Sequence, residues 1–445
     1  MASTVIVKVK QGSLRGKKIT AYNGSTYYSF QGIPYAKPPI GSLRFKAPEL
    51  PESWSGIRDA LSPGKCAPQI MQLPDGNKLI GDENCLFLNV YTPQLPVQTD
   101  IKKAVMVWIH GGAFTHGSGG PDMYGPDHLI KGDVVLVTLN YRLGTLGFLY
   151  TEDTETSGNA GLKDQVMALQ WIQENIIQFS GDPNNVTIFG ESAGGVSVHG
   201  HVLSPMSKGL FHKAIAQSGS MLNTWGCVSN PRERAFRIGE TLGCKTNDSR
   251  KLVEFLRDAP PLDLLEAIDK TQTNEEKISF DLYFAPCVEN VVQKGDKKFI
   301  PADPYQLLSE GKFNKVPFIT GFTSHEGMMM LRALNQHPSF IDVIANHEEG
   351  VIPYTRKLKK NTTQSKEVAS TIKTFYFGDK SVSKETLPEL IDMYGDAFFI
   401  HGIRKTVELQ TQHSKNPIYM YEFSFDEDLP FIKIIVSGDR LPGIP

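Results

Sequence analysis

The sequence predicts an α/β protein with a mostly parallel central sheet that is covered by helices on both faces. Short apolar runs alternate with helical patterns from residue 86 onward, and these runs lack the alternation of a half-exposed strand. The clearest helical pattern, at 161–179, places Leu162, Val166, Leu169 and Ile172 on one face. Buried strands separated by such helices require helical layers on both sides of the sheet.

The elements follow one another in a consistent order. The alternating residues 5–16 and 27–35 predict an antiparallel hairpin at the N-terminus, followed by a turn-rich loop. Two long helical stretches, 229–280 and 326–412, interrupt the strands and are expected to lie above the sheet, where they form the walls of a pocket. No repeat, low-complexity tract or linker divides the chain, so we expect one domain over 1–445. Strands are expected at 86–91, 104–109, 134–139, 186–189, 214–217, 318–321 and 418–423.

Composition excludes several classes of function. The chain has 445 residues, 40% of them hydrophobic, which is enough for a large core. Its net charge of −2 provides no positive electrostatic potential that would attract nucleic acid. The five cysteines are too irregularly spaced for a metal site, and we expect no metal and no cofactor. No run of residues is long and apolar enough to span a membrane, and the N-terminus lacks the apolar core of a signal peptide. We therefore expect a cytoplasmic protein, or a secreted one if a leader is missing.

The segment Gly190-Glu-Ser-Ala-Gly194 has the spacing of a nucleophile elbow. It follows an apolar strand and precedes a helical stretch at 192–203, which is the context that this motif requires. Glycines on both sides of Ser192 permit a turn too tight for side chains, and the turn presents the serine hydroxyl above the sheet. Ser192 is thus the candidate nucleophile.

Hydrolysis through a serine also needs N–H donors for the oxyanion and an acid that orients the base. The glycines of Trp108-Ile-His-Gly-Gly-Ala-Phe114 follow a strand directly, and we assign the donors to the N–H groups of Gly112, Ala113 and Ala193. The acid candidate is Glu326, which follows the strand at 318–321. The chain order serine, then acid, is that of α/β-hydrolases.

These motifs, taken together, resemble the type-B carboxylesterases, the family of insect esterases and cholinesterases, from near the N-terminus to the last residue. The resemblance implies an α/β-hydrolase fold and a carboxylic ester hydrolase, with small-molecule esters as substrates and detoxification as the role of the enzyme. It also implies that organophosphates and carbamates inhibit the protein by reacting with Ser192. It is carried by Gln31-Gly-Ile-Pro-Tyr-Ala36, Glu83-Asn-Cys-Leu-Phe-Leu-Asn-Val-Tyr-Thr-Pro93, His110-Gly-Gly-Ala-Phe114, Asn140-Tyr-Arg-Leu-Gly144 and Gly181–Gly195.

The resemblance implies roles for further residues. It implies a disulfide between Cys66 and Cys85, which bracket a loop that such a bond could close. It implies ion pairs of Arg44 with Glu83 and of Arg142 with Asp164. Glu191 and Ser218 match positions beside the nucleophile, and Trp225 matches an aromatic residue of the acyl pocket. The loop from Cys66 to Cys85 contains no Trp, so a cation–π site for a quaternary ammonium is not expected and a general ester is preferred.

The base is the element that the sequence does not supply. In the family the histidine stands in a Gly-x-x-His motif just after a segment like Leu441-Pro-Gly-Ile-Pro445, where this sequence stops. None of His337, His347, His401 and His413 stands in such a motif. Because loss of the base costs about a millionfold in turnover in subtilisin, we expect a nearly inactive chain that is incomplete at its C-terminus. The alternatives are a catalytically dead fragment and a non-catalytic adhesion or binding member of the same fold.

Overall fold

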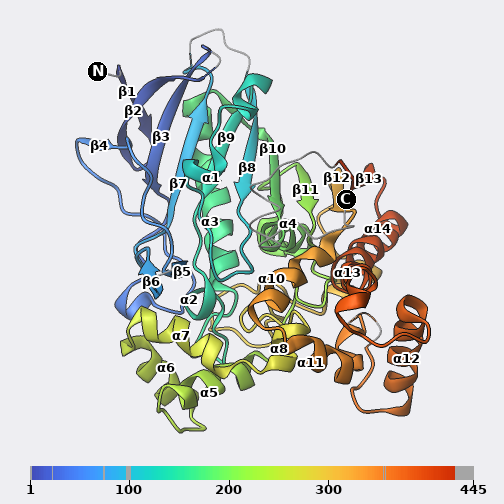
Figure 1. The fold of residues 1–445 in the computed structure, drawn as a ribbon. Helices are drawn as coiled ribbons and strands as arrows, with labels where there is room; N and C mark the ends of the chain where they lie inside the picture. The colour runs from blue at the N-terminus through green and yellow to red at the C-terminus, as the bar shows by residue number, and fades with distance from the viewer. Residues whose placement is uncertain are drawn as a thin grey trace.

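The computed structural model describes residues 3–22, 24–73, 76–96, 102–353, 355 and 357–425. Its central feature is an eleven-stranded twisted sheet, shown in Figure 1, against which the helices pack. The strands lie in the order β1 (Thr4–Val9), β2 (Gly12–Thr20), β3 (Thr26–Pro34), β7 (Phe87–Thr92), β9 (Val135–Leu139), β8 (Lys103–Ile109), β10 (Gly181–Glu191), β11 (Lys213–Gln217), β12 (Phe318–Thr323) and β13 (Ile418–Phe423), with β4 (Ile57–Asp59) paired to β2.

The sheet is antiparallel at its N-terminal end, except for the short parallel pairing of β2 with β4, and it is parallel elsewhere. In the spatial order given above, each neighbouring pair from β1 through β9 is antiparallel. Each neighbouring pair from β9 through β8 and β10 to β13 is parallel. The predicted mostly parallel α/β sheet is therefore confirmed. The predicted N-terminal antiparallel strands are present, but the stretch 5–16 is divided by a turn between β1 and β2, so three strands form where two were expected.

The central strands are buried because their residues are apolar on both faces. All five residues of β9 are buried, and Val105, Val107 and Ile109 of β8 are fully inaccessible to water. Runs of this kind require helices on both sides of the strand. The predicted strands from 86–91 to 318–321 all occur, with ends that differ by a few residues; β10 is longer because it begins at Gly181.

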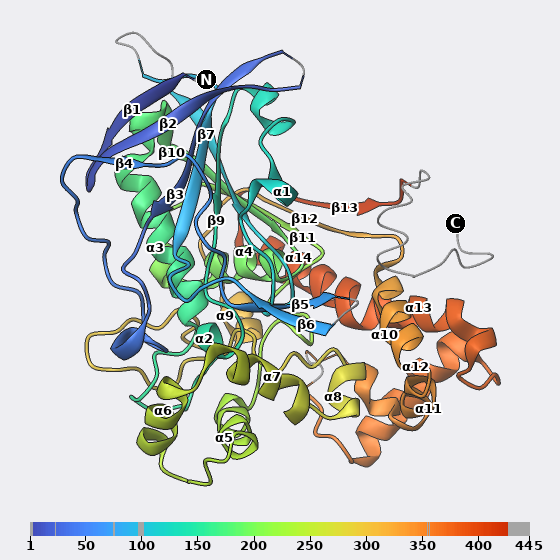
Figure 2. The same cartoon turned by 60° about the vertical axis from the view of Figure 1, so that its left-hand side comes forward.

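Helices follow the strands and also form a separate layer. The predicted helix 161–179 is α3 (Ala160–Asn175), which tightens into a 3₁₀ turn over Ile176–Phe179. Figure 1 shows a group of helices below the sheet and another to its lower right, and Figure 2 shows that both lie beyond the same end of the strands. The first group is α5 (Pro231–Thr241), α6 (Ser249–Asp258), α7 (Pro261–Thr271) and α8 (Asn274–Ile278). The second group is α10 (Met329–Gln336), α11 (Phe340–Asn346), α12 (Thr363–Phe377), α13 (Leu387–Gly395) and α14 (His401–His413). The other α-helices of the described residues, besides α3, are α1 (Pro121–Tyr124), α2 (Gly144–Phe148), α4 (Ala193–Leu203) and α9 (Pro304–Ser309).

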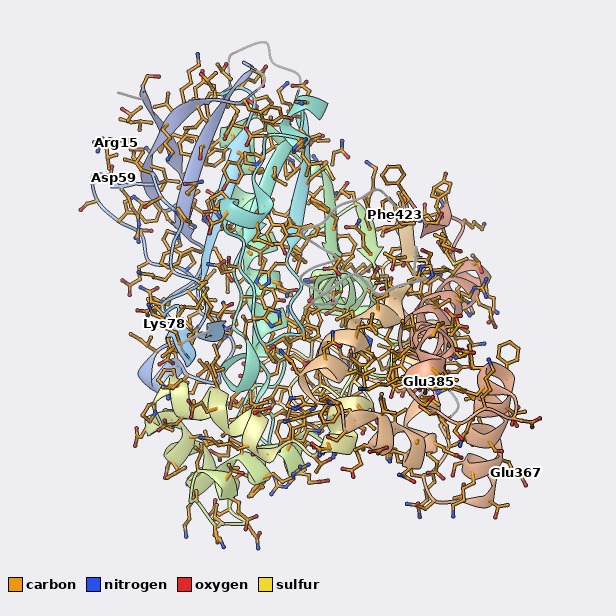
Figure 3. The ribbon with its side chains drawn as sticks, in the orientation of Figure 1. Arg15, Asp59, Lys78, Glu367, Glu385 and Phe423 are labelled. Carbon is orange, nitrogen blue, oxygen red and sulfur yellow. The ribbon has the colours of Figure 1, made fainter. Side chains whose placement is uncertain are left out.

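Two features differ from the sequence prediction. Strand β13 was expected to be buried, but Tyr419, Met420 and Phe423 are 59%, 45% and 55% exposed, because β13 pairs with β12 alone within the described residues. Figure 3 labels Phe423 at this edge of the sheet. The loop between Cys66 and Cys85 contains a small hairpin, β5 (Gln69–Leu73) and β6 (Gly76–Ile80), that the sequence did not predict.

Several sequence predictions remain open. The segment Leu441–Pro445, which the C-terminal argument used, lies outside the described residues, and so does part of the predicted single domain over 1–445. In the described ranges we find no helix with the length and apolar character needed to cross a membrane. In the same ranges no three metal-ligating side chains come together.

Candidate active site

Ser192 stands in a strained turn between β10 and α4. Its φ of 58° and ψ of −122° lie in a region that side chains rarely adopt, and its N–H donates to Gln217 O at 2.8 Å. Such a conformation costs about 1–3 kcal/mol and persists only where the surroundings enforce it. A Cβ at Gly190 would lie 2.5 Å from the Ile109 carbonyl oxygen, and a Cβ at Gly194 would overlap the same oxygen. The predicted elbow geometry is therefore present, and the backbone of β8 explains why both positions need glycine.

The close approach at Gly194 gives a stability prediction. We expect Gly194→Ala to lower the free energy of unfolding by about 1–3 kcal/mol, the usual cost of overpacking, because the backbone of Ile109 cannot move aside. Urea denaturation measures this. Gly132→Ala is the matched control, since a Cβ there meets no atom within 4 Å, and this variant should unfold like the wild type. Equal stability of the two variants would show that the elbow is not tightly packed.

The predicted oxyanion loop lies directly beside Ser192. It leaves β8 after Ile109, and a Cβ at Gly111 would lie 3.3 Å from the Ser192 Cβ. The backbone then turns through three positive φ angles, at Gly112 (104°), Ala113 (53°) and Phe114 (58°). Within the described part of the chain, the N–H groups of Gly112, Ala113 and Ala193 donate to no other residue. All three N–H groups are thus free to donate to a ligand, and their assignment to the oxyanion hole stays a prediction.

Three polar residues come together at the ends of neighbouring parallel strands. Glu191 ends β10, Ser218 follows β11, and Glu326 follows β12. Glu326 is 7% exposed; its Oε1 accepts from the Thr323 N–H at 2.8 Å, and it is hydrogen-bonded to the Ser218 side chain. Burial raises the pKa of Glu326, and the hydrogen bonds from Ser218 and Thr323 oppose that rise. Sequence reasoning placed these residues near the nucleophile, and the structure brings them together there.

The environment of Glu191 is unusual for a glutamate next to a serine. Desolvation by the surrounding protein, together with the charge of Glu326, raises its pKa to about 7. The side chain nevertheless keeps an exposed surface, so water screens part of this effect. Near neutral pH, Glu191 and Glu326 therefore share a site in which two full negative charges are disfavoured.

This raised pKa predicts a pH-dependent effect of Glu191→Gln. The ordinary pKa of a glutamate is 4.5, and the pKa of Glu191 in the folded chain is about 7. Between these two pH values the unfolded chain loses the Glu191 proton while the folded chain keeps it. The free energy of unfolding of the wild type should therefore fall as pH rises from 4.5 to 7. Above pH 7 this loss of stability has reached its full size. The glutamine variant lacks this penalty, so its stability relative to wild type should grow by about 1 kcal/mol from pH 4.5 to 8, after allowance for solvent screening.

The matched control for this pH effect is Glu254→Gln, at an exposed glutamate of α6. Thermal or urea unfolding at several pH values measures both variants. A stability difference between Glu191→Gln and wild type that does not change with pH would contradict the raised pKa.

Trp225 lies deeper than a pocket wall would require. It is 4% exposed, its Nε1–H donates to Phe398 O at 2.9 Å, and its ring centroid lies 5.4 Å from that of Phe399. Both phenylalanines belong to a π-helix, Asp396–Ile400, that joins α13 to α14. Trp225 therefore supports this π-helix, and its assignment to the acyl pocket stays a prediction.

The predicted disulfide between Cys66 and Cys85 is wrong, because both residues are free cysteines in the structure. Burial raises the pKa of both thiols, strongly so for the fully buried Cys85. The two family ion pairs are present: the Arg44 Nε–H donates to Glu83 at 2.8 Å, and Arg142 binds Asp164 through both side-chain oxygens.

The histidines nearest to Ser192 along the chain are His199 and His201 of α4, and both are fully buried. The His199 Nδ1 accepts from the Met221 N–H at 3.0 Å, and the His201 ring contacts Ser207 and Gln165. Burial lowers both pKa values to about 3. Other histidines contact Tyr22 (His128), Gly111 (His110), Val186 (His212), Ser324 (His325), Phe340 (His337) and Thr355 (His401).

The fold and the site together are those of a serine hydrolase with the α/β-hydrolase fold. Comparison with known proteins shows which family of serine hydrolases the chain resembles. Residues 3–437 match the description "Carboxylesterase family". The chain is 40% identical over 437 residues to esterase E4 of Myzus persicae, covering 97% of this chain and 77% of that protein. It is 38% identical over 434 residues to juvenile hormone esterase of Tribolium castaneum, covering 94% of this chain and 72% of that protein.

A solved structure is similar along almost the whole chain. The crystal structure of juvenile hormone esterase from Manduca sexta, with OTFP covalently attached, has a TM-score of 0.87 and 31% identity, covering 98% of this chain and 81% of that one. The chain belongs to the carboxylesterase family. It is a carboxylic ester hydrolase, as the sequence motifs predicted.

Proposed function

We propose that this carboxylesterase works through an acyl-enzyme on Ser192 and acts on a broad range of small esters as a detoxifying enzyme. The observation that carries this proposal is the strained Ser192 turn, which lies against Gly111 at the start of a loop. In the described residues, the N–H groups of Gly112 and Ala113 in this loop, and that of Ala193, have no other acceptor. A serine held at this energetic cost between unpartnered donors fits nucleophilic catalysis. A covalent ligand on the similar juvenile hormone esterase also supports the proposal.

In this mechanism the Ser192 Oγ forms a bond to the ester carbonyl carbon, and the Oγ proton passes to a base. The carbonyl electron pair moves onto oxygen, where the three N–H groups stabilise the negative charge. Collapse of this intermediate expels the alcohol, which takes the proton, and leaves the acyl group on Ser192. Water then adds to the acyl carbon, releasing the carboxylic acid and restoring the hydroxyl. Glu326 orients the base, and Ser218 and Thr323 hold Glu326 in place.

The same nucleophile accounts for the proposed inhibitors. Attack of the Ser192 Oγ on an organophosphate forms a serine–phosphorus bond and expels the leaving group, and attack on a carbamate leaves a carbamoyl group on the same oxygen. Both adducts resist the water step, so the enzyme would bind such compounds stoichiometrically. This chemistry needs only the activated serine and the oxyanion donors.

We further propose that the base is none of the eleven histidines of this sequence. His199 and His201 are buried on α4 with their ring nitrogens bonded to other groups. His110 is buried under Tyr141, with ring centroids 4.4 Å apart. His325, next to the acid, contacts Ser324. These contacts support a chain in which the serine and its donors are assembled but proton transfer is slow.

A panel of esters tests the function. In the presence of imidazole as an added base, acetate, butyrate and octanoate esters should all be hydrolysed, with kcat/KM values that differ by no more than about a hundredfold. Ser192→Ala should abolish this activity, while Ser309→Ala, at an exposed serine of α9, should leave it unchanged. Turnover of one ester alone would contradict the broad specificity, and turnover that survives in Ser192→Ala would contradict the mechanism. Absence of any Ser192-dependent chemistry would favour the binding role instead.

A further inference from the structure

A glutamine outside the catalytic residues holds the loop that carries the oxyanion donors. The Gln69 Nε2–H donates to Gly117 O at 2.9 Å, and the Gly117 N–H donates to the Gln69 Oε1 at 2.8 Å. One side-chain amide thus satisfies both backbone groups of one loop residue, as a neighbouring strand would. Gln69 is 7% exposed and opens the hairpin of β5 and β6, so it reaches the loop from a separate part of the chain.

The Gln69 side chain is itself fixed. Its Nε2 also donates to Ala67 O at 3.1 Å, so both amide protons are used. Burial and three hydrogen bonds leave the side chain one orientation. The position of Gly117 is therefore set by the hairpin and not by the loop alone.

Gly117 in turn lies against the start of the oxyanion loop. Its φ is 109°, and a Cβ there would lie 2.5 Å from the His110 Nδ1 and 2.7 Å from Gly111 O. Gly111 is the residue that lies beside Ser192. A displacement of Gly117 would therefore be transmitted through direct contact to the peptide groups next to the nucleophile.

Other side chains also hold this loop: the Tyr141 hydroxyl donates to His110 O at 2.9 Å at its start, and two amides act further along it. Asn140 Oδ1 accepts from the Gly119 N–H at 2.8 Å, and the Asn89 Nδ2–H donates to Gly119 O at 3.0 Å. These two amides anchor the loop to the central sheet at β7 and β9. Gln69 is the amide that acts nearest to Gly112 and Ala113, and it comes from the hairpin.

We infer that Gln69 is a positioning residue for the oxyanion hole, which it aligns by fixing Gly117 against His110 and Gly111. The inference rests on the proposed role of Gly112, Ala113 and Ala193 as oxyanion donors. A shift of about 1 Å in such a constellation can cost about a hundredfold in rate. Because the donors act on the transition state more than on the bound ester, this loss falls on kcat and leaves KM nearly unchanged.

The test compares Gln69→Met with Gln173→Met. Gln173 is a matched control because its Nε2 also donates to two backbone oxygens, of Pro183 at 2.8 Å and Leu210 at 3.0 Å, away from the loop. Hydrolysis of ethyl butyrate is followed in the presence of imidazole as an added base, together with the melting temperature of each variant. We expect Gln69→Met to lose about a hundredfold in kcat at constant KM, and Gln173→Met to keep the wild-type kcat.

A second variant separates positioning from general loss of structure. Gln69→Glu keeps the acceptor for the Gly117 N–H but places a carboxylate against two carbonyl oxygens. Burial against these oxygens raises the pKa of the new carboxyl above its ordinary value of about 4.3. The kcat relative to wild type should therefore be low above that raised pKa and recover below it, where a protonated glutamate again donates to Gly117 O. A merely structural residue would show no such recovery in kcat.

The outcomes are distinct. Equal kcat values for Gln69→Met and Gln173→Met, in a wild type that shows Ser192-dependent turnover, would overturn the role of Gln69 and leave the proposed function intact. The positioning role of Gln69 would also be overturned if Gln69→Met lost kcat only in proportion to its loss of folded protein and Gln69→Glu showed no recovery of kcat at low pH. A wild type without any Ser192-dependent turnover would overturn the proposed function and this inference with it.

Discussion

Imidazole should raise the rate at which the 445-residue chain hydrolyses an alkyl ester by about a hundredfold or more, the low end of the contribution of general base catalysis. The reason is that Ser192, its N–H donors and Glu326 are assembled, while His199 and His201 are bonded elsewhere. If none of its histidines is the base, as we propose, the turnover without imidazole should be lower by about a millionfold than that of a complete triad, the loss seen in subtilisin. Ethyl butyrate is the suitable substrate, because imidazole itself attacks activated phenyl esters.

The rate supported by imidazole should follow the neutral form of the added base and vanish in Ser192→Ala. The matched controls are Ser309→Ala, which should respond like the wild type, and substitution to alanine of His116 and His325, the histidines beside the oxyanion loop and the acid. Rapid hydrolysis without imidazole that disappears in one of the histidine variants would identify that histidine as the base and contradict the proposal.

Asp164→Ala should lower the free energy of unfolding by about 3–5 kcal/mol, the largest stability effect that we expect of a single substitution. The Arg142 Nε–H donates to the Asp164 Oδ2 at 2.8 Å, and a second guanidinium nitrogen donates to Oδ1 at 2.6 Å. The two side chains are 3% and 0% exposed. Removal of the carboxylate leaves a buried guanidinium without its partner, and the cost of that desolvated charge appears in full. Urea denaturation measures the loss.

The control for this prediction is Asp59→Ala, which removes the carboxylate of an exposed ion pair. Figure 3 labels Arg15 and Asp59 on the outer N-terminal strands, and their ion pair of 2.7 Å is 38% and 58% exposed. Exposed pairs contribute about 1 kcal/mol or less. Similar losses for Asp164→Ala and Asp59→Ala would contradict the view that burial, and not the ion pair as such, makes the Arg142–Asp164 pair structural.

The sheet could be predicted from sequence because its strands have simple local causes. Strand β9 is apolar at nearly every residue, which only a strand covered on both faces tolerates. The exposure of β13 could not be predicted from its own residues, since Ile418–Phe423 is as apolar as strands that are buried. Burial depends on what lies beside a strand, and sequence periodicity does not report that.

The nucleophile elbow and the oxyanion loop were predictable for a related reason. Positions 190, 194 and 112 need glycine because a side chain there would collide with the backbone. This requirement produces a glycine spacing that can be recognised in the sequence. Glu326 could be assigned only with the help of the chain order, since a glutamate after a strand has no distinctive local pattern.

The residues that sequence reasoning missed act over long distances along the chain. Gln69 contacts Gly117 from 48 positions away, through one amide that looks like any polar loop residue. The π-helix at Asp396–Ile400 that receives the Trp225 hydrogen bond has no local marker either. The disulfide prediction failed because cysteine spacing shows that two thiols can meet, and it does not show whether they are oxidised.

The most direct test of the central claim is to trap the acyl-enzyme. The chain is mixed with a butyrate ester in the presence of imidazole, quenched in acid before the water step is complete, and digested. The masses of the peptides are then measured by mass spectrometry. A single butyryl group on the peptide that contains Ser192, absent from Ser192→Ala, is the result that our account predicts. Ester hydrolysis that proceeds with no acyl group on Ser192, or with the acyl group on another residue, would contradict it.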